Sequence, residues 1–455
     1  MKVQNPLGKE YKDLILPDNT FIAHMKDPEV LKDPKNAIVK SLENPIGSES
    51  LMVIAKGKKK DKANAKAVIV VSDNTRPVPY KGESGILLPI IDILMSSGYN
   101  KDQITVLVAT GMHRPMTEDE LRFMIDQKVF DLGIKVINHE PKNNDRLVLI
   151  GRTGRGTNVT IDSLYMEADL KITTGLVESH FMAGASGGRK SICPGVIGEE
   201  STFIFHGPEL MGSPDSRDLL IEGNPVHEES LEVAKMAGVD FICNVTLDHS
   251  FKITGVFSGD LEKAHEAAVA KIRETVEVPV PQKADIVITH GGFVGINHYQ
   301  VAKCGVASIG ALKEGGYLIS IADCKDKGHV IGSVNYRVTL TLLKLLGPEK
   351  FVKLLKSQDW VFLPEQWQVQ MWARVFRVID QNNFYFYAPQ IGSSWYDSIP
   401  GIDVRALGSV NDSCDDYNNV LELAIKDIEK RTGKNRKDLT ITFLQEGPYE
   451  IPVAR

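Results

Sequence analysis

The chain has 455 residues, roughly three times the ~150 residues of an average domain, so its length excludes a single small binding module. Hydrophobic residues make up 42% and charged residues 25% of the sequence, which is typical of globular proteins and excludes a disordered, collagen-like or coiled-coil chain. The formal net charge of −6 does not favour binding to a polyanion such as nucleic acid.

The N-terminal segment, MKVQNPLGKEYKDLIL, lacks the continuous apolar core of a signal peptide. The most apolar window, 85–95, is interrupted by Pro89 and Asp92, so we expect no membrane span. The cysteines form no CxxC pair, which argues against a disulfide framework or a thiolate zinc site and fits a reducing compartment. We therefore expect a cytoplasmic protein. The cysteines are Cys193, Cys243, Cys304, Cys324 and Cys414.

One basic run, KGKKKDKANAK at 56–66, stands out against the acidic balance of the chain. Taken alone, it is compatible with nucleic-acid binding. It contains no aromatic residue and directly precedes a hydrophobic strand, and both features favour a solvated loop.

From residue 65 onward, short β-branched runs alternate with helical stretches, which predicts α/β layering around a largely parallel sheet. Thr117 is expected to cap one of the helices, and Asp260 is expected to be the N-cap of another. The predicted strands are 65–73, 103–111, 134–140, 146–151, 168–176 and a pair within 241–257; the predicted helices are 86–98, 117–126, 227–238 and 260–276.

The segment VEVPVPQK at 276–283 interrupts all periodicity and is the predicted linker between two domains. A second α/β unit is expected after it, with Pro364 opening a long helix. We expect an N-terminal domain at 1–278, a C-terminal domain at 283–402, and a segment at 403–455 that returns to the first domain. The predicted elements after the linker are strands at 284–292, 316–324 and 439–445 and helices at 299–313, 365–376 and 417–433.

Three of the predicted strands run directly into polar turns. These turns are SDNTRP at 72–77, TGMHRP at 110–115 and ESH at 178–180. In open α/β sheets, ligands bind beyond the carboxyl ends of the strands, so the turns are expected to converge on one crevice.

The segment 175–207 concentrates glycine, basic residues and histidine. Its GASGGRKS core does not match a P-loop, because Arg189 occupies the position where glycine must precede the lysine. The glycines would let the backbone approach a ligand closely, and Arg189 and Lys190 would bring positive charge to the same place. An anionic ligand and a solvent-facing glycine turn both fit this pattern.

Three of the eleven histidines are placed at strand or segment ends: His113, His180 and His206. No HExxH spacing is present, so a zinc hydrolase has no signature here. If His206 binds a metal, the other ligands must come from elsewhere. Each histidine taken singly is also compatible with an ordinary buried or surface residue.

Past the linker, NHYQVAK at 297–303 spans a predicted helix start. Tyr299 and Lys303 are i, i+4 neighbours on one face, and a helix N-terminus favours an anion such as a carboxylate. A surface lysine lying over tyrosine fits the same spacing.

Taken together, these motifs resemble the nickel-pincer-nucleotide enzymes of the lactate racemase family. The matching segments are SDNTRP, TGMHRP, NHEP, SHFMAGASGGRKSICPG with the later His206, and HYQVAK, which run in order across 72–303, with a weaker echo at EQWQVQ. The resemblance implies a racemase or epimerase that inverts C2 of lactate or of another 2-hydroxy or sugar acid.

The cofactor implied by the resemblance is a nickel pincer of pyridinium-3,5-bisthiocarboxylic acid mononucleotide. It would be bound covalently to Lys190, and His206 would complete the nickel coordination. His113 and His180 correspond to the catalytic acid/base pair. The other implied cofactor contacts are Asp73, Thr75, Arg76, Gly187, Gly188 and Arg189; the implied substrate contacts are Arg76, Tyr299, Gln300, Lys303 and Trp367.

The chemistry agrees with this resemblance. The α-hydrogen of a hydroxy acid is a poor acid, so its removal as hydride by a cofactor is easier than its removal as a proton. Two enantiomers present the hydroxyl group in two directions, which calls for two histidines. Separate cofactor-synthesis enzymes are implied as maturation partners.

The expected fold class is therefore α/β, with two α/β domains, largely parallel sheets and an interdomain active-site cleft. Two alternatives remain. An NAD-type hydroxy acid oxidoreductase would hold a soluble dinucleotide, although GRTGRG at 151–156 fails the GxGxxG pattern. A non-catalytic nickel- or nucleotide-binding protein would retain the cluster without turnover.

Overall fold

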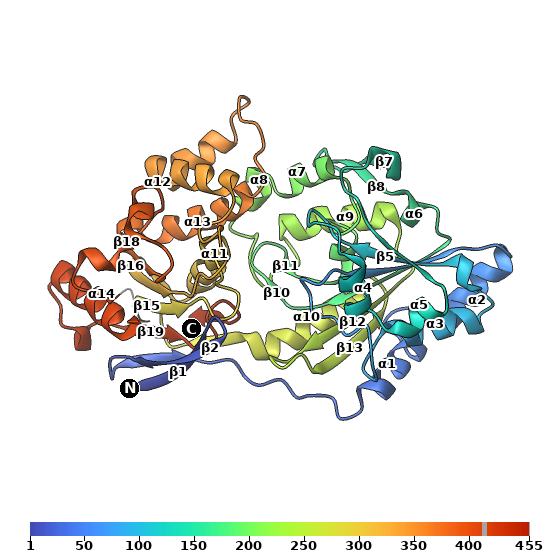
Figure 1. The fold of residues 1–455 in the computed structure, drawn as a ribbon, viewed down its shortest axis with the longest axis horizontal. Coiled ribbons are helices and arrows are strands. Elements are labelled where there is room, and N and C mark those ends of the chain that lie inside the picture. The colour runs from blue at the N-terminus through green and yellow to red at the C-terminus, as the bar shows by residue number, and fades with distance from the viewer. Residues whose placement is uncertain (412–415, 455) are drawn as a thin grey trace. The chain divides into compact units, whose positions relative to one another are not determined.

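The computed structural model describes residues 1–411 and 416–454, which divide into two compact units (Figure 1). Unit 1 comprises Met1–Lys26, Gly207–Pro214 and Thr275–Arg455. Unit 2 comprises Asp27–His206 and Asp215–Glu274.

Unit 2 is built on a six-stranded sheet in the order β13-β12-β9-β4-β5-β6. Its neighbouring strands are parallel except for β13, which forms an antiparallel hairpin with β12. The strands of this unit are β4 Ala67–Ser72, β5 Ile104–Ala109, β6 Lys135–Asn138, β7 Leu147–Arg152, β8 Asn158–Asp162, β9 Leu170–Leu176, β10 Ser179–His180, β11 Gly184–Ala185, β12 Phe241–Leu247 and β13 Ile253–Gly259. Its helices are α1 Pro34–Glu43, α2 Leu51–Asp61, α3 Leu87–Ser96, α4 Glu118–Met124, α5 Gln127–Asp131, α6 Ser163–Met166, the 3₁₀ turn η3 Gly188–Ser191, α7 Thr202–Phe205, α9 Pro225–Ala237 and α10 Lys263–Val276.

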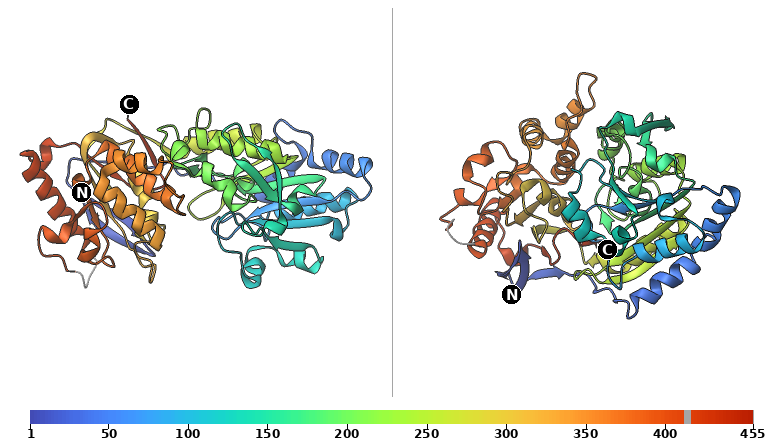
Figure 2. Two further views of the ribbon diagram at one scale, coloured as in Figure 1. Left: turned by 90° about the horizontal axis from the view of Figure 1, so that it is seen from above. Right: turned by 45° about the vertical axis from the view of Figure 1, so that its right-hand side comes forward.

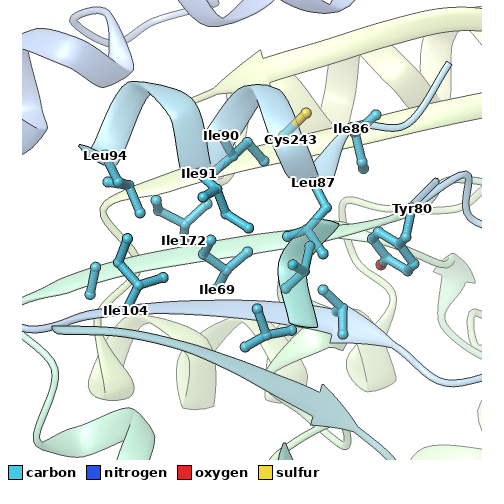
Figure 3. Close-up of a cluster of buried hydrophobic side chains, with 14 of the residues drawn as sticks. Ile69, Tyr80, Ile86, Leu87, Ile90, Ile91, Leu94, Ile104, Ile172 and Cys243 are labelled. Atoms are coloured by element: carbon cyan, nitrogen blue, oxygen red, sulfur yellow. The ribbon is translucent and has the colours of Figure 1, made fainter. Parts of the chain in front are cut away.

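Helix α3 covers one face of this sheet, as Figure 3 shows. Its buried residues Leu87, Ile90, Ile91 and Leu94 follow the i, i+3, i+4, i+7 spacing of a single helix face. They belong to the same apolar core as strand residues such as Ile69. Burying each of these side chains contributes about 1.5–3 kcal/mol to folding, so the helical period in the sequence fixes which face of α3 meets the sheet.

The predicted start of helix α4 is confirmed in detail. The Thr117 hydroxyl accepts a hydrogen bond from Glu120 N–H at 3.3 Å, and the Glu120 carboxylate accepts one from Thr117 N–H at 2.8 Å. Helix α10, by contrast, begins at Lys263 and not at residue 260. Asp260 caps the preceding turn, because its Oδ1 accepts from Glu262 N–H at 3.1 Å and Lys263 N–H at 2.9 Å.

The prediction of a solvated loop at 56–66 is wrong for most of its length, because α2 extends to Asp61. The helix buries Leu51 and Ala55 and leaves its lysines at the surface. Three lysines of the basic run meet carboxylates: Lys58 Nζ lies 2.8 Å from Asp240 Oδ1, Lys62 Nζ lies 2.9 Å from Asp169 Oδ1, and Lys66 Nζ lies 3.1 Å from Glu167 Oε2. These carboxylates partly neutralise the basic run.

Unit 1 contains a second six-stranded sheet, in the order β18-β17-β16-β15-β19-β3, and all its neighbouring strands are parallel. Its strands are β1 Lys2–Leu7, β2 Glu10–Ile15, β3 Thr20–Ala23, β14 Glu277–Val280, β15 Ala284–His290, β16 Leu312–Ile321, β17 Phe384–Tyr387, β18 Ile402–Asp403, β19 Ile441–Leu444 and β20 Ile451–Ala454. Its helices are α8 Pro208–Met211, α11 His298–Ser308, α12 Val334–Leu355, α13 Gln366–Val378 and α14 Tyr417–Thr432.

The segment 403–455 does not return to the first domain as expected. Strand β19 pairs with β15 and with the N-terminal strand β3, and residues from α14 join the core beneath the same sheet. Both views in Figure 2 show the blue N-terminal strands and the red α14 within this unit. Residues 1–26 therefore also lie outside the predicted N-terminal domain, because β3 supplies an edge strand of the second sheet.

The segment 276–283 is not a free linker either. Strand β14 pairs in parallel with β20 over Glu277–Val280 and Ile451–Ala454. Helix α13 begins at Gln366 and not at Pro364, because Glu365 at its N-cap has φ +70°. The helix predicted at 299–313 ends at Ser308, since β16 starts at Leu312.

No helix in the described part of the chain is both long and apolar enough to cross a membrane. The four described cysteines, Cys193, Cys243, Cys304 and Cys324, are buried free thiols. Cys414 lies outside the described residues.

Candidate active site

The turns after β4 and β5 meet through Asp73 and His113. The strands are adjacent and parallel, so their carboxyl ends lie at the same edge of the sheet. Asp73 Oδ2 lies 2.7 Å from His113 Nδ1. Asp73 Oδ1 accepts hydrogen bonds from the Thr75 backbone N–H at 3.2 Å and from the Thr75 hydroxyl at 2.5 Å. Burial raises the pKa of Asp73, but the hydrogen bonds from His113 and Thr75 outweigh it and hold that pKa below its usual value.

The Asp73 carboxylate determines which nitrogen of His113 is basic. An ionised carboxylate only accepts hydrogen bonds, so Nδ1 must carry a proton. In the neutral ring, Nε2 then carries the lone pair. The His113 side chain is 58% exposed, and this nitrogen is available to accept a proton from a bound molecule.

The turn after β9 brings His180 to Lys190. His180 Nδ1 accepts hydrogen bonds from the backbone N–H groups of Met182 at 3.3 Å and Ala183 at 3.2 Å. The proton of the neutral ring is therefore on Nε2, which lies 3.1 Å from Lys190 Nζ. A protonated amine could not accept this N–H, so the geometry favours a neutral Lys190 amine.

The electrostatic surroundings of Lys190 point the same way. Burial, followed by the positive charges of Arg189 and Arg76, lowers the pKa of Lys190 to about 7. A neutral amine is the nucleophilic form of lysine, so Lys190 is suited to form a covalent bond with a carbonyl or thiocarbonyl carbon.

We expect the acylation of Lys190 in the apoprotein to rise with a midpoint near pH 7, because the amine is neutral above its lowered pKa. Competitive labelling with acetic anhydride across a pH series, read by peptide mass spectrometry, gives this profile. Lys283, an exposed lysine of the same chain, is the internal reference. Coincident profiles for the two lysines would contradict the assignment.

Arg76 is held by a residue that the sequence analysis did not assign. Its Nε lies 3.0 Å from Glu178 Oε1, and both side chains are partly exposed. The backbone of Glu178 is itself fixed by Ser186, whose N–H donates to Glu178 O at 2.9 Å and whose hydroxyl accepts from Glu178 N–H at 2.9 Å. The position of Glu178 directly before SH was the only available signal in the sequence.

The lysine loop, defined here as residues 183–190, contains three glycines with positive φ, and two of them, Gly187 and Gly188, directly precede Arg189. Gly187 has φ +72° and Gly188 has φ +51°, a region that side chains rarely adopt. A Cβ at Gly187 would lie 2.7 Å from Val177 Cγ2, and one at Gly188 would lie 2.7 Å from His265 Cδ2. These glycines therefore allow the loop to pack closely on its own unit.

Arg189 differs from the expectation that it faces a ligand. Its side chain is 1% exposed, and its Nη2 donates to Ala183 O at 2.5 Å. The guanidinium is thus used inside the lysine loop, while the neighbouring Lys190 contacts His180.

His206 is the C-cap of α7 and is half-buried. Burial, followed by the charge of Lys190, lowers the pKa of His206 to about 3, so the imidazole is neutral and has a lone pair for a metal. Among the described residues, no group of three or more His, Cys, Asp or Glu side chains could hold a metal ion. The donor set fits a metal whose other ligands belong to a bound cofactor.

In unit 1, helix α11 carries the second predicted cluster. Asn297 caps the helix and accepts from Gln300 N–H at 2.9 Å. Trp367 Nε1 donates to the Tyr299 hydroxyl at 3.0 Å, so the structure brings these two predicted residues together. Gln300 Oε1 is buried without a hydrogen-bond partner in the described chain, and Lys303 is half-buried on the same helix. An unsatisfied buried amide oxygen is typical of a site that awaits a hydrogen-bond donor.

Comparison with known proteins gives consistent matches across the chain. Residues 7–218 match the family model of the lactate racemase N-terminal domain, and residues 280–381 match that of the lactate racemase C-terminal domain. The lactate racemase of Thermoanaerobacterium thermosaccharolyticum is 34% identical over 397 residues, covering 84% of this chain and 89% of that protein. The lactate racemase of Lactiplantibacillus plantarum is 35% identical over 343 residues, covering 75% and 77%.

The fold is similar to solved structures as well. The lactate racemase apoprotein of Thermoanaerobacterium thermosaccharolyticum aligns with a TM-score of 0.82 at 30% identity, covering 99% of this chain and 100% of that chain. A protein from Thermotoga maritima aligns with a TM-score of 0.60 at 16% identity, covering 95% and 100%, and this match concerns the fold alone.

Proposed function

The chain belongs to the lactate racemase family, and its enzyme class is isomerase. From this premise we propose that it inverts the C2 centre of a short 2-hydroxy acid such as lactate. The observation that carries the proposal is the pair formed by the Lys190 amine and His180 Nε2 at 3.1 Å, in the same unit as the His113–Asp73 pair.

The proposed cofactor is a nickel-pincer pyridinium mononucleotide attached to Lys190. When bound, it supplies a carbon that can accept and return the C2 hydride. Lys190 offers the neutral amine for attachment, and His206 offers the neutral imidazole as protein ligand to nickel. Arg76 and Thr75 are placed beside Asp73 and Glu178, where they can orient the polar groups of the nucleotide. We also propose that separate enzymes synthesise and deliver this group.

The two histidines are proposed to move the hydroxyl proton. His113 starts with a basic Nε2, set by Asp73, while His180 starts with an N–H at Nε2, set by two backbone donors. The rings therefore begin in complementary states, one ready to accept a proton and the other to donate a hydrogen bond. The proton taken up by His113 Nε2 is returned to the substrate oxygen when the reaction is completed.

The substrate carboxylate is proposed to bind at the start of α11. Lys303 supplies positive charge, and the Nε2–H₂ group of the Gln300 amide would donate a directional hydrogen bond to the carboxylate. Tyr299 and Trp367, joined by their 3.0 Å hydrogen bond, form the aromatic side of this group.

The test is a chiral assay on protein produced together with the cofactor-synthesis enzymes. We expect conversion of either lactate enantiomer toward the racemate, about one nickel per chain and a mass adduct on the Lys190 peptide. Loaded protein that binds nickel but inverts no member of a 2-hydroxy acid panel would instead support a non-catalytic binding protein. Turnover that requires added NAD would support an oxidoreductase.

A further inference from the structure

The lysine loop is held in place by two buried side chains that are not part of the proposed chemistry, one from the loop itself and one from helix α10. Arg189 and His265 are each 1% exposed. Arg189 Nη2 donates to Ala183 O at 2.5 Å, at the start of the loop. His265, which comes from α10, places its Nε2 2.9 Å from Ser186 O, in the middle of the loop.

His265 Nε2 is bound to the lysine loop through one of two neighbours. Burial, followed by the charge of Arg189, lowers the pKa of His265 to about 3, and the ring therefore stays neutral. In the neutral ring, Nε2 either donates to the Ser186 carbonyl at 2.9 Å or accepts from Arg189 Nη1 at 3.0 Å. Both neighbours belong to the loop, so either tautomer ties His265 to it.

The loop also rests directly on the imidazole ring. A Cβ at Gly188 would lie 2.7 Å from His265 Cδ2 and 2.8 Å from His265 Cγ, which leaves room for hydrogen alone. Gly188 and Lys190 lie in the same short turn, η3. The position of the His265 ring against Gly188 therefore determines the position of the Lys190 backbone.

The opposite side of the ring is closed by a second histidine. His227 of α9 stacks on His265 with centroids 6.2 Å apart and an interplanar angle of 19°. Both rings line a cavity of about 10 Å³, close to the size that holds one water molecule. His227 Nδ1 and Arg189 Nε have no hydrogen-bond partner in the described chain, and such a water could serve both atoms.

We propose that His265, assisted by Arg189, is the positioning residue for the Lys190 amine. The inference rests on the proposed role of Lys190 as the attachment residue. Holding Ala183 and Ser186 fixes the backbone N–H groups that define the His180 tautomer, and resting Gly188 on the ring fixes the origin of the Lys190 side chain. Together these contacts keep Lys190 Nζ within 3.1 Å of His180 Nε2.

The test replaces the hydrogen bond and the ring separately. His265→Phe keeps a ring beneath Gly188 but cannot donate to Ser186 O, whereas His265→Gln can donate but has no ring. His249→Phe is the matched control, because it removes a histidine in the exposed turn between β12 and β13, away from the lysine loop. The readout is the pH profile of Lys190 acylation in the apoprotein, with the melting temperature measured in parallel.

We expect His265→Phe to raise the midpoint of the Lys190 profile by at least about one pH unit, because a relaxed loop returns the amine to water. His265→Gln should recover part of this shift, and His249→Phe should leave the profile unchanged. A His265→Phe protein that melts like the wild type and keeps its Lys190 midpoint would overturn the proposal.

If His265→Phe fails to fold, Gly188→Ala takes its place. This substitution leaves His265 unchanged and pushes the loop away from its ring with the added methyl group. Its profile should shift in the same direction, and an unchanged midpoint in folded Gly188→Ala would also overturn the proposal. These measurements need no cofactor. They therefore fail or succeed independently of the racemase assay.

Discussion

Lys190→Ala is expected to remove the cofactor adduct completely and to lower racemase activity by at least about 10³-fold, to the level of the uncatalysed background. The reason is that the Lys190 amine is in the protonation state that acylation requires. Burial and nearby positive charge keep it neutral near pH 7, and His180 meets it at 3.1 Å. Alanine keeps the backbone of η3 while removing the nucleophile.

The measurement is intact mass together with nickel analysis and the chiral assay, all on protein from the same cofactor-producing host. Lys283→Ala is the matched control, since it removes an exposed lysine and should change neither adduct nor rate. Lys190→Arg should behave like Lys190→Ala, because a guanidinium stays protonated. Racemisation at the wild-type rate by a Lys190→Ala protein without adduct would contradict the proposed attachment.

His113→Asn and His180→Asn are each expected to slow racemisation by about 10²- to 10⁴-fold per loaded enzyme, the range typical of general acid–base groups. Asparagine preserves polarity and approximate size but cannot exchange a proton near neutral pH. His113 depends on Asp73 for its basic nitrogen, and His180 depends on two backbone donors for its N–H. Loss of either ring therefore breaks the transfer in both directions of an otherwise reversible reaction.

The two variants should differ in loading. His113→Asn leaves the Lys190 environment intact and should carry a normal adduct, whereas His180→Asn removes the group that meets the amine and should load more slowly. His249→Asn, in the exposed turn between β12 and β13, is the control for histidine loss at the surface. If both active-site variants, corrected for loading, racemise lactate normally, the acid/base assignment is wrong.

The family membership predicted from the ordered motifs between residues 72 and 303 is confirmed. So is the α/β class, because the alternation of β-branched runs and helical stretches is a short-range property that burial enforces locally. Most predicted elements also occur within a few residues of their expected bounds. The Thr117 cap is one example, because a capping box depends on residues three positions apart.

The domain boundaries could be predicted less well from the sequence than the individual helices and strands. Two prolines suggested a free linker at 276–283, but β14 pairs there with β20, whose strand lies at the end of the described chain. The segment 403–455 joins the second sheet because β19 fits beside β15, about 155 residues away in sequence. Pairing between such distant strands depends on the packing of whole sheets, which no local pattern encodes.

The candidate site also combines features that are local in the sequence with features that depend on long-range packing. By itself the sequence determined the residue types and their places at strand ends: Asp73, His113, His180, Lys190 and His206. Only the tertiary structure decided which nitrogen of His113 and of His180 carries the proton, that Arg189 turns inward, that Glu178 holds Arg76, and that His265 supports the loop from 79 residues away. The physical reason is that tautomer, burial and hydrogen-bond partner depend on neighbours brought together by folding, whereas the chemical nature of a side chain and the periodicity around it are already present in the unfolded chain.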